Sequence, residues 1–182
     1  MTTTREDPNR RHWEDVAAGR PSAWQALATE PDGVTVDPVA VPPGLRLRPP
    51  GADPRGVVLA IHGGGFVSGS PATHRRMFGH LARAARVEVV VPEYGLVPAQ
   101  VFPDQPDAVL RAYRVVADGG GRVAVVGDSC GAMLAMGLAA SLRDSGDPPP
   151  VGLLLMSAWT DLEATGASYD AGSDPFFTRD VV

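Results

Sequence analysis

The sequence predicts an α/β fold with a mostly parallel sheet and helices on both faces. From residue 57 onward, short apolar runs alternate with amphipathic segments, and this alternation is typical of a parallel sheet. The runs are hydrophobic at nearly every position, as in strands buried on both faces. Two glycine-rich loops, at 62–66 and 127–132, directly follow two of these runs. Ligands of parallel sheets bind at the carboxyl ends of the strands, so both loops are candidate functional segments.

Composition and charge narrow the class of protein. The chain has 182 residues, of which 44% are hydrophobic and 20% charged, and this length is enough for one real core. Its net charge is −5 and its basic residues are all arginine, so we expect neither nucleic acid nor a membrane surface as a partner. A single cysteine excludes an internal disulfide framework. No signal peptide and no apolar stretch of roughly 20 residues is present, so we expect a soluble cytoplasmic protein.

The first part of the chain predicts a helical arm followed by a hairpin. Residues 9–28 form one or two short amphipathic helices, with an apolar set of Trp13, Val16, Ala17, Trp24 and Leu27. "VTVDPVAV" and "LRLRP" then alternate with a period of two and are broken by prolines, as in an antiparallel hairpin near a sheet edge. We assign 1–31 to a cap-like N-terminal arm and 32–182 to the main α/β region.

The rest of the chain alternates between strands and helices. A strand at 57–62 precedes a helix at 72–86, the strand "VEVVVP", a proline-rich loop at 92–103 and a helix from near Pro106. "RVAVVG" leads into the second glycine-rich loop, and "AMLAMGLAASLR" is a helix that is apolar nearly all round and therefore central. "GDPPP" ends this helix, "VGLLLMS" is another buried strand, and roughly the last 25 residues are irregular.

The hexapeptide "GDSCGA" at 127–132 places Ser129 between two glycines, after a strand and before a helix. This pattern is typical of a nucleophile elbow, in which a strained turn exposes the serine hydroxyl. A β-carbon at either flanking glycine would collide with the neighbouring strand or helix. The start of the helix favours a developing negative charge. The alternative is an ordinary turn in which Ser129 caps the helix.

The loop "HGGGF" at 62–66 ends the earlier strand. An elbow enzyme needs amide donors at this place to complete an oxyanion hole, and successive glycines let the backbone approach a substrate oxygen. The alternatives are a flexible turn or a phosphate-binding loop. No lysine and no dinucleotide or Walker pattern accompanies the loop, which disfavours phosphate.

At these residues the sequence resembles the hormone-sensitive-lipase-like esterases of the α/β-hydrolase superfamily. The resemblance runs from about residue 32 to the end. It rests on "HGGGF", "GSPATHRR", "PEYGLVPAQVFPDQPDAV", "GDSCGA" and "MSAWTDL", and "SDPFFTRDVV" looks like the start of the family's lid segment. It implies an α/β-hydrolase fold that is incomplete at the C-terminus.

The resemblance also implies the chemistry. Ser129 would be the catalytic nucleophile, and Gly64, Gly65 and Cys130 would give the amides of the oxyanion hole. His62 would have a structural role at the end of its strand. The implied activity is a lipase-like serine hydrolase acting on small carboxylic esters with short acyl, acetyl or lactone groups, without cofactor or metal. The oligomeric state stays open.

Several residues depart from the family pattern. Gly95 stands where the family has an arginine, Ala99 where it has a glutamate, Ala132 where it has a glycine and Ala158 where it has a proline. Cys130 replaces an alanine and invites a rival assignment as nucleophile. Only the apex of the turn points into the cleft, so we expect Cys130 to be a small buried hydrophobic residue.

The general base is the open question. Family triads run in the chain order Ser, Asp, His, whereas His12, His62, His74 and His80 all precede Ser129. We expect His74 and His80 on a helix surface and His12 in the N-terminal arm. Asp128 is expected to point away from the cleft, and Asp161 to anchor a loop. The triad Asp and His are thus absent from the chain, which as given should have little or no activity.

Three hypotheses follow. The first is an incomplete member of a carboxylesterase family. The second is a catalytically incomplete remnant that serves as a binding or interaction module. The third is a serine peptidase or thioesterase on the same fold, which the glycine-rich loop at 62–66 disfavours.

Overall fold

The computed structural model describes residues 7–18, 20 and 23–172. It divides into two compact units, one of them Thr29–Trp159 and the other the described parts of 1–28 and 160–182. The segment 173–182, which resembles the start of a lid, lies outside the described residues. The assignment of 1–31 to an arm and of 32–182 to one domain stays a prediction.

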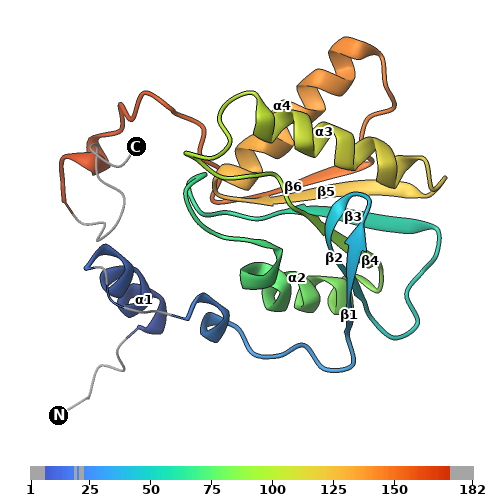
Figure 1. Ribbon diagram of the computed structural model, residues 1–182, viewed down its shortest axis with the longest axis horizontal. Coiled ribbons are helices and arrows are strands. Elements are labelled where there is room, and N and C mark those ends of the chain that lie inside the picture. The colour runs from blue at the N-terminus through green and yellow to red at the C-terminus, as the bar shows by residue number, and fades with distance from the viewer. Residues whose placement is uncertain (1–6, 19, 21–22, 173–182) are drawn as a thin grey trace. The chain divides into compact units, whose positions relative to one another are not determined.

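A six-stranded sheet runs through the unit Thr29–Trp159 (Figure 1). The strand order is β1-β2-β4-β3-β5-β6, and β2 is antiparallel to both β1 and β4, while all other pairs are parallel. The strands are β1 (Thr35–Ala40), β2 (Pro43–Arg48), β3 (Gly56–Ile61), β4 (Glu88–Pro92), β5 (Arg122–Asp128) and β6 (Gly152–Met156). The predicted mostly parallel sheet with an initial antiparallel hairpin is confirmed.

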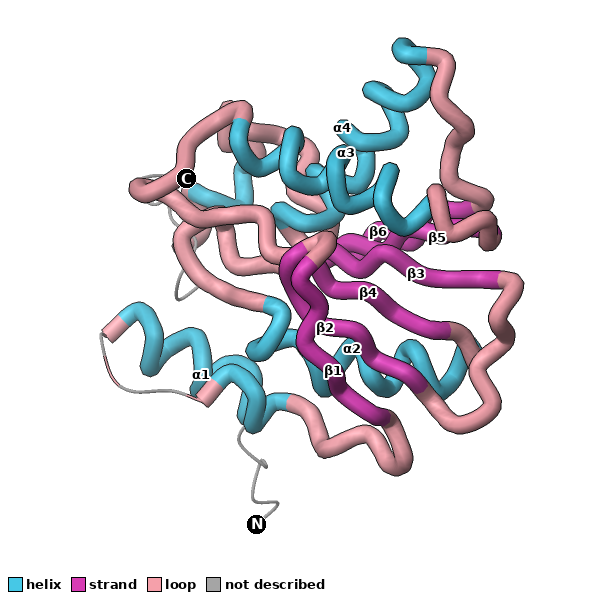
Figure 2. Tube along the Cα trace, turned by 45° about the vertical axis from the view of Figure 1, so that its right-hand side comes forward, coloured by secondary structure: helices cyan, strands magenta, loops and turns pink. Residues whose placement is uncertain are grey.

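Helices cover both faces of this sheet (Figures 1 and 2). Helix α2 (Pro71–Ala85) packs on one face, against β2 and β4, whereas α3 (Asp104–Ala117) and α4 (Cys130–Ser145) pack on the other. Helix α2 begins with a capping box, in which Ser70 and Thr73 exchange side-chain-to-backbone hydrogen bonds. This box satisfies two amides at the helix start.

Alternation along the central strands explains their continuously apolar sequences. In β3, Leu59 and Ile61 belong to the core beneath α3 and α4, while Ala60 faces the core beneath α2. The same division holds in β5, where Val125 lies in the first core and Val126 in the second. Each fully buried aliphatic side chain of this kind contributes roughly 1.5–3 kcal/mol to folding.

Strand β6 differs from its prediction as a buried strand. Leu153, Leu154 and Leu155 are 42%, 49% and 38% exposed. Within the described residues β6 pairs with β5 alone and is the edge of the sheet. The continuously apolar sequence predicts two covered faces, but in this structure the edge position leaves the leucines accessible.

The other unit holds the helical elements of the N-terminal arm. Helix α1 (Pro8–Ala17) and the short 3-10 helix η1 (Trp24–Leu27) confirm the predicted short helices. The rings of His12, Trp13 and Trp24 contact one another, with centroids 4.9–5.7 Å apart. His12 is buried within this cluster. The 3-10 helix η2 (Ala167–Tyr169) follows later in the chain.

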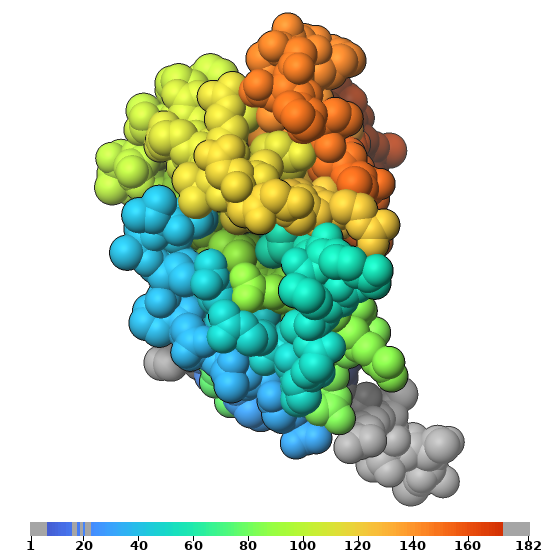
Figure 3. Space-filling view, turned by 90° about the vertical axis from the view of Figure 1, so that its right-hand side faces the viewer, coloured from blue at the N-terminus to red at the C-terminus, as the bar shows by residue number. Residues whose placement is uncertain are grey.

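A cavity of about 390 Å³ opens at the amino ends of the parallel strands, away from both glycine-rich loops. Figure 3 shows this face, where green atoms of the β4 region lie set back between the blue and teal segments. Charged side chains in the lining of this cavity pair with one another: Arg46 Nε and Arg48 Nε lie 3.0 and 3.2 Å from the carboxylate of Glu88. No described helix is long and apolar enough to cross a bilayer, and the cytoplasmic location stays a prediction.

Candidate active site

Ser129 lies at the sharp turn between β5 and α4 and has an unusual backbone conformation. Its φ is 55° and its ψ is −119°, a region that costs a non-glycine residue on the order of 1–3 kcal/mol. Backbone bonds hold the turn: the Ser129 N–H donates to the Met156 carbonyl at 2.9 Å, and the Ser129 carbonyl accepts from the Ala132 N–H at 3.0 Å. The side chain makes no capping hydrogen bond, so the alternative of a helix cap is not what the structure shows.

The glycines on either side of Ser129 leave no room for a side chain. A β-carbon at Gly127 would lie 2.5 Å from the Cα of Ala132, in the first turn of α4. One at Gly131 would lie 2.5 Å from the carbonyl oxygen of His62, at the end of β3. The collisions expected from the sequence are therefore present, and they come from the backbone on both sides.

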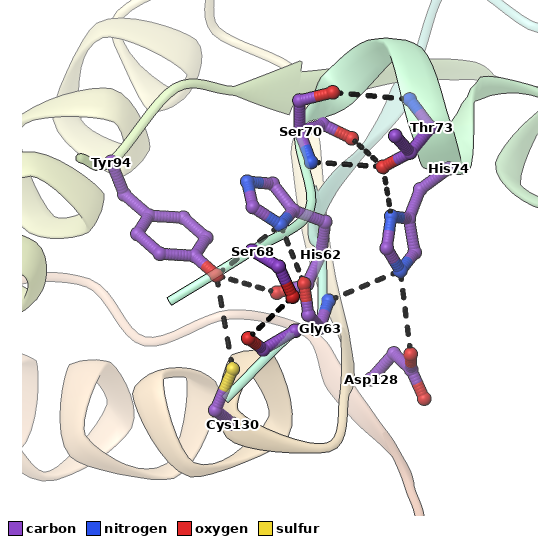
Figure 4. A network of polar contacts seen from close by, with 10 residues as sticks. His62, Gly63, Ser68, Ser70, Thr73, His74, Tyr94, Asp128 and Cys130 are labelled. Atoms are coloured by element: carbon purple, nitrogen blue, oxygen red, sulfur yellow. Dashed lines mark hydrogen bonds and ion pairs between the residues drawn. The ribbon is translucent and has the colours of Figure 1, made fainter. Parts of the chain in front are cut away.

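The glycine-rich loop at 62–66 is folded by a turn around Gly64. The N–H and the hydroxyl of Ser68 both donate to the Gly64 carbonyl, each at 3.0 Å (Figure 4). Gly64 and Gly65 have φ values of 126° and 61°, which favour glycine. Among the residues that the structure describes, no hydrogen bond occupies the amide of Gly64 or that of Cys130. These two amides are available to an oxygen of a ligand.

The two loops lie against each other. Ile61 pairs with Gly127 in the register of β3 and β5, so both loops leave the sheet at the same level. A β-carbon at Gly63 would lie 2.6 Å from Oδ2 of Asp128. The structure thus brings Gly64, Gly65, Ser129 and Cys130 to one end of the sheet.

Cys130 is fully buried directly behind the turn. Its Sγ lies 3.8 Å from the hydroxyl of Tyr94 (Figure 4). Burial raises the pKa of the Cys130 thiol, although hydrogen bonds from the backbone of Phe66 and Gly65 act in the opposite direction. A buried, protonated thiol is a poor nucleophile, and this supports the expectation that Cys130 is a small buried residue.

His62 is buried at the end of β3 and is bonded to groups other than Ser129. Its Nδ1 lies 2.8 Å from the Gly63 carbonyl, and because a carbonyl only accepts, Nδ1 carries the hydrogen. Its ring stacks on Tyr94, whose hydroxyl donates to the His62 carbonyl at 3.0 Å. Burial lowers the pKa of His62 to about 4. A neutral, fixed imidazole agrees with the structural role that the family resemblance implies.

The expectation for His74 was wrong, whereas that for His80 holds. His74 is only 3% exposed and contacts Thr73, Gly63 and Asp128 with its ring nitrogens. His80 is exposed on α2, and its Nε2 lies 3.0 Å from Thr29 Oγ1. The sequence around His74 is rich in arginine, which indicates an exposed helix surface, whereas the side chain of His74 itself is buried.

The two aspartates make different contacts: Asp161 has the loop contacts that the sequence suggested, whereas Asp128 contacts His74, which the sequence did not suggest. The carboxylate of Asp128 lies 3.5 Å from Nε2 of His74. Asp161 accepts hydrogen bonds from the Glu163 N–H at 3.0 Å and from the Thr165 N–H at 2.8 Å. The hydrogen bond from the Thr165 side chain is the main reason that the pKa of Asp161 is lowered. Asp161 therefore anchors a loop.

Gly95, a departure from the family pattern, has a local explanation. Its φ is 81°, and the carboxamide of Gln100 occupies the space where a side chain at position 95 would begin. The Gln100 carbonyl in turn accepts from Nε2 of the buried Gln105 at 2.8 Å. A glutamine thus fills the place beside residue 95.

Aromatic side chains stand beside the glycine-rich loop. The ring of Phe66 lies 6.5 Å from that of Tyr94 and 6.2 Å from that of Trp159. The Trp159 N–H also donates to the Ser129 carbonyl at 3.4 Å. No cluster of metal-ligating side chains occurs in the described part of the chain.

Comparison with known proteins places this arrangement in a family. A family model described as an alpha/beta hydrolase fold matches residues 58–182. An acetyl-hydrolase of Streptomyces hygroscopicus is 38% identical over 126 residues, which are 68% of this chain and 42% of that protein. The carboxylesterase NlhH of Mycobacterium tuberculosis is 35% identical over 161 residues, or 83% of this chain and 49% of that protein.

Comparison with solved structures gives the same family. An esterase from the bacterial hormone-sensitive lipase family superposes with a TM-score of 0.78 at 34% identity, covering 98% of this chain and 61% of the other. The chain thus spans less than half the length of the two relatives named above. The resemblance predicted from the sequence is confirmed.

Proposed function

The chain belongs to the α/β-hydrolase family, and from this premise we propose that it carries the nucleophile and the oxyanion hole of a serine hydrolase of small carboxylic esters. Ser129 is the proposed nucleophile. Gly64, Gly65 and Cys130 are the proposed amide donors. Acetyl-hydrolases and carboxylesterases among the relatives support an ester as the substrate.

One observation carries the proposal. Ser129 has a strained backbone, and its hydroxyl does not cap the helix that follows. The neighbouring amides of Gly64 and Cys130 have no hydrogen-bond partner within the described chain. A strained residue next to two unused donors is explained by a ligand oxygen, because an ordinary turn would satisfy these groups internally.

The proposed chemistry follows from this arrangement. Ser129 Oγ attacks the carbonyl carbon of the ester while a base takes its proton, and the carbonyl electron pair moves to the oxygen. The resulting oxyanion is received by the amide of Gly64 and by that of Cys130 at the start of α4. The amide of Gly65, the third proposed donor, faces the buried Cys130 thiol in this structure and turns from it to the oxyanion. Collapse of the intermediate expels the alcohol, which receives the proton from the base. Water then hydrolyses the acyl group on Ser129 in the same manner.

The base must be a group other than the three histidines in the unit Thr29–Trp159. His62 is buried with its Nδ1 bonded to the Gly63 carbonyl, His74 is buried with both ring nitrogens bonded, and His80 contacts Thr29. Removing one member of a catalytic triad costs several orders of magnitude in rate but leaves some catalysis from the oxyanion hole. The proposal therefore requires a base other than these three histidines.

The aromatic side chains suggest the size of the acyl group. Phe66 and Trp159 lie with ring centroids 6.2 Å apart, and Trp159 is joined to the Ser129 turn through its backbone N–H. Apolar rings joined to the turn of the nucleophile in this way suit a short acyl chain. We therefore propose acetyl and butyryl esters as substrates, in preference to long-chain esters.

The second candidate is a catalytically incomplete module that binds without turnover. It is favoured by the absence of a histidine bonded to Ser129 within the described residues. Reaction of the native protein with a fluorophosphonate probe separates the two. Labelling that is lost in Ser129→Ala, together with cleavage of p-nitrophenyl acetate, supports the hydrolase. Binding of an acetyl ester without either reaction supports the module.

A further inference from the structure

His74 lies at the junction of the two glycine-rich loops, although it has no part in the chemistry proposed above. It belongs to the first turns of α2 and is 3% exposed. Its ring stacks on Phe78 of the same helix, with centroids 5.9 Å apart, and lies 5.4 Å from the ring of His62. Burial of a polar ring is costly unless its nitrogens are bonded.

Both ring nitrogens of His74 have partners (Figure 4). Nδ1 lies 2.9 Å from Oγ1 of Thr73, a hydroxyl that the capping box of α2 holds against the backbone of Ser70. Nε2 accepts the N–H of Gly63 at 3.3 Å. A ring nitrogen that accepts a hydrogen bond carries no hydrogen, so in the neutral imidazole the hydrogen is on Nδ1.

These contacts connect three segments. Gly63 immediately precedes Gly64, the first proposed oxyanion donor, and Asp128 immediately precedes Ser129. Nε2 of His74 is 3.3 Å from the amide of Gly63 and 3.5 Å from Oδ2 of Asp128. Gly63 and Asp128 are themselves in contact, with no space for a β-carbon between them. One imidazole therefore contacts the residue before each proposed functional group.

We propose that His74 is a positioning residue for the oxyanion hole. Its Nε2 lone pair fixes the direction of the Gly63 amide on one side of that residue. On the other side the Gly63 carbonyl accepts from His62 Nδ1 at 2.8 Å, and because this carbonyl and the Gly64 amide belong to one planar peptide, the two contacts together set the direction of the Gly64 amide. The capping box holds Thr73, and Thr73 contacts the other side of the ring. His74 therefore fixes the position of the loop relative to helix α2. This inference rests on the proposed function, because it assigns His74 to the same reaction.

Two amide side chains test this role. Gln at position 74 can place an acceptor where Nε2 stands, whereas Asn is one methylene shorter and reaches only the position of Nδ1. Both are smaller than histidine and lose the ring equally. If His74 only fills space, His74→Gln and His74→Asn behave alike. If it positions the loop, only His74→Asn loses function.

The measurement is kcat and KM of the native protein with p-nitrophenyl acetate. We expect His74→Asn to lower kcat on the order of ten- to a hundred-fold with KM nearly unchanged, since a displaced donor affects the transition state most. His74→Gln should retain most of kcat. His80→Asn, at the exposed histidine of the same helix, is the control and should match the wild type. Equal losses in His74→Gln and His74→Asn would overturn the proposal.

A second measurement does not depend on activity. Hydrogen exchange of the Gly63 amide, followed by NMR, should become roughly five- to ten-fold faster in His74→Asn because its acceptor is lost. It should stay near the wild-type rate in His74→Gln. Absence of ester cleavage in the wild type would refute the proposed function alone, whereas unchanged Gly63 exchange in His74→Asn would refute the role of His74.

Discussion

The imidazole of His62 stacks on the ring of Tyr94, with centroids 4.2 Å apart and planes inclined by 23°. Both side chains are 1% exposed. Burial lowers the pKa of His62 from 6.5 to about 4, against the opposing effect of its hydrogen bond to Gly63. The folded protein therefore resists protonation of this ring, while the unfolded chain does not.

The first prediction is a loss of stability at mildly acidic pH. Above pH 6.5 neither state protonates His62, so it has no effect. As the pH falls from 6.5 to about 4, the unfolded chain binds a proton that the folded protein does not, and stability decreases. The difference between the two pKa values of His62 corresponds to on the order of 3 kcal/mol in the free energy of unfolding.

Urea unfolding between neutral pH and about pH 5 checks this, because linkage relates the slope to proton uptake. His62→Asn should reduce the pH dependence, while the control His80→Asn, at an exposed position, should leave it unchanged. A His62 ring that titrates near 6.5 by NMR in the folded protein would contradict the prediction.

The second prediction compares two glycines of helix α4. Gly131→Ala should destabilise the protein by about 1–3 kcal/mol, because its β-carbon would press on the backbone at the end of β3. Gly137→Ala is the control, since it is exposed and has nothing within 4 Å of the added carbon. Alanine favours a helix interior over glycine by roughly 0.5–1 kcal/mol, so Gly137→Ala should stabilise. Thermal or urea unfolding measures both, and equal effects would refute the tight contact at Gly131.

The third prediction concerns Gly95 and Gln100. Gly95→Ala should destabilise through two causes, a φ of 81° and an overlap with the Gln100 carboxamide. The backbone cost alone is about 1–2 kcal/mol. Gln100→Ala removes the overlap but not the backbone cost, so Gly95→Ala should cost less in that background.

A double-mutant cycle of unfolding free energies isolates the coupling. Purely additive effects of Gly95→Ala and Gln100→Ala would mean that the carboxamide of Gln100 does not occupy this space in solution.

The sequence predicts those parts of the molecule that depend on local pattern. The strands around Leu59 and Val125 follow from apolar runs, and the turn at Ser129 follows from flanking glycines that only a tight backbone approach requires. The predicted surface position of His74 is wrong because its partners Gly63 and Asp128 are distant in the chain and its neighbours are arginines. Contacts of this kind depend on how elements pack, which a local pattern does not contain.

Strand β6 is the opposite case, because the sequence predicts it to be buried and its leucines are partly exposed. Its run of leucines predicts burial on two faces, but hydrophobic composition indicates which residues can be buried and not which neighbours are present. The contact between Gln100 and Gly95 could not be predicted from the sequence, for a third reason. It depends on the direction of one glutamine side chain in a proline-rich loop, for which the sequence has no periodic signal.

The last prediction separates Cys130 from Ser129. Cys130 has no exposed surface, and burial raises its pKa. Reactivity of a cysteine requires an accessible thiolate, so iodoacetamide should not modify the folded native protein at neutral pH and should modify it in urea. Mass spectrometry measures both reactions.

Substitution of Cys130 and of Ser129 by alanine should separate the two residues by their effect on activity. Cys130→Ala keeps the backbone amide proposed as an oxyanion donor and removes only the thiol, so most of the p-nitrophenyl acetate cleavage should remain. Ser129→Ala removes the proposed nucleophile, and triad substitutions of this kind lower kcat by several orders of magnitude. Loss of activity in Cys130→Ala with retention in Ser129→Ala would reverse the assignment. It would make the buried thiol the nucleophile, and the turn would then have to open to expose it.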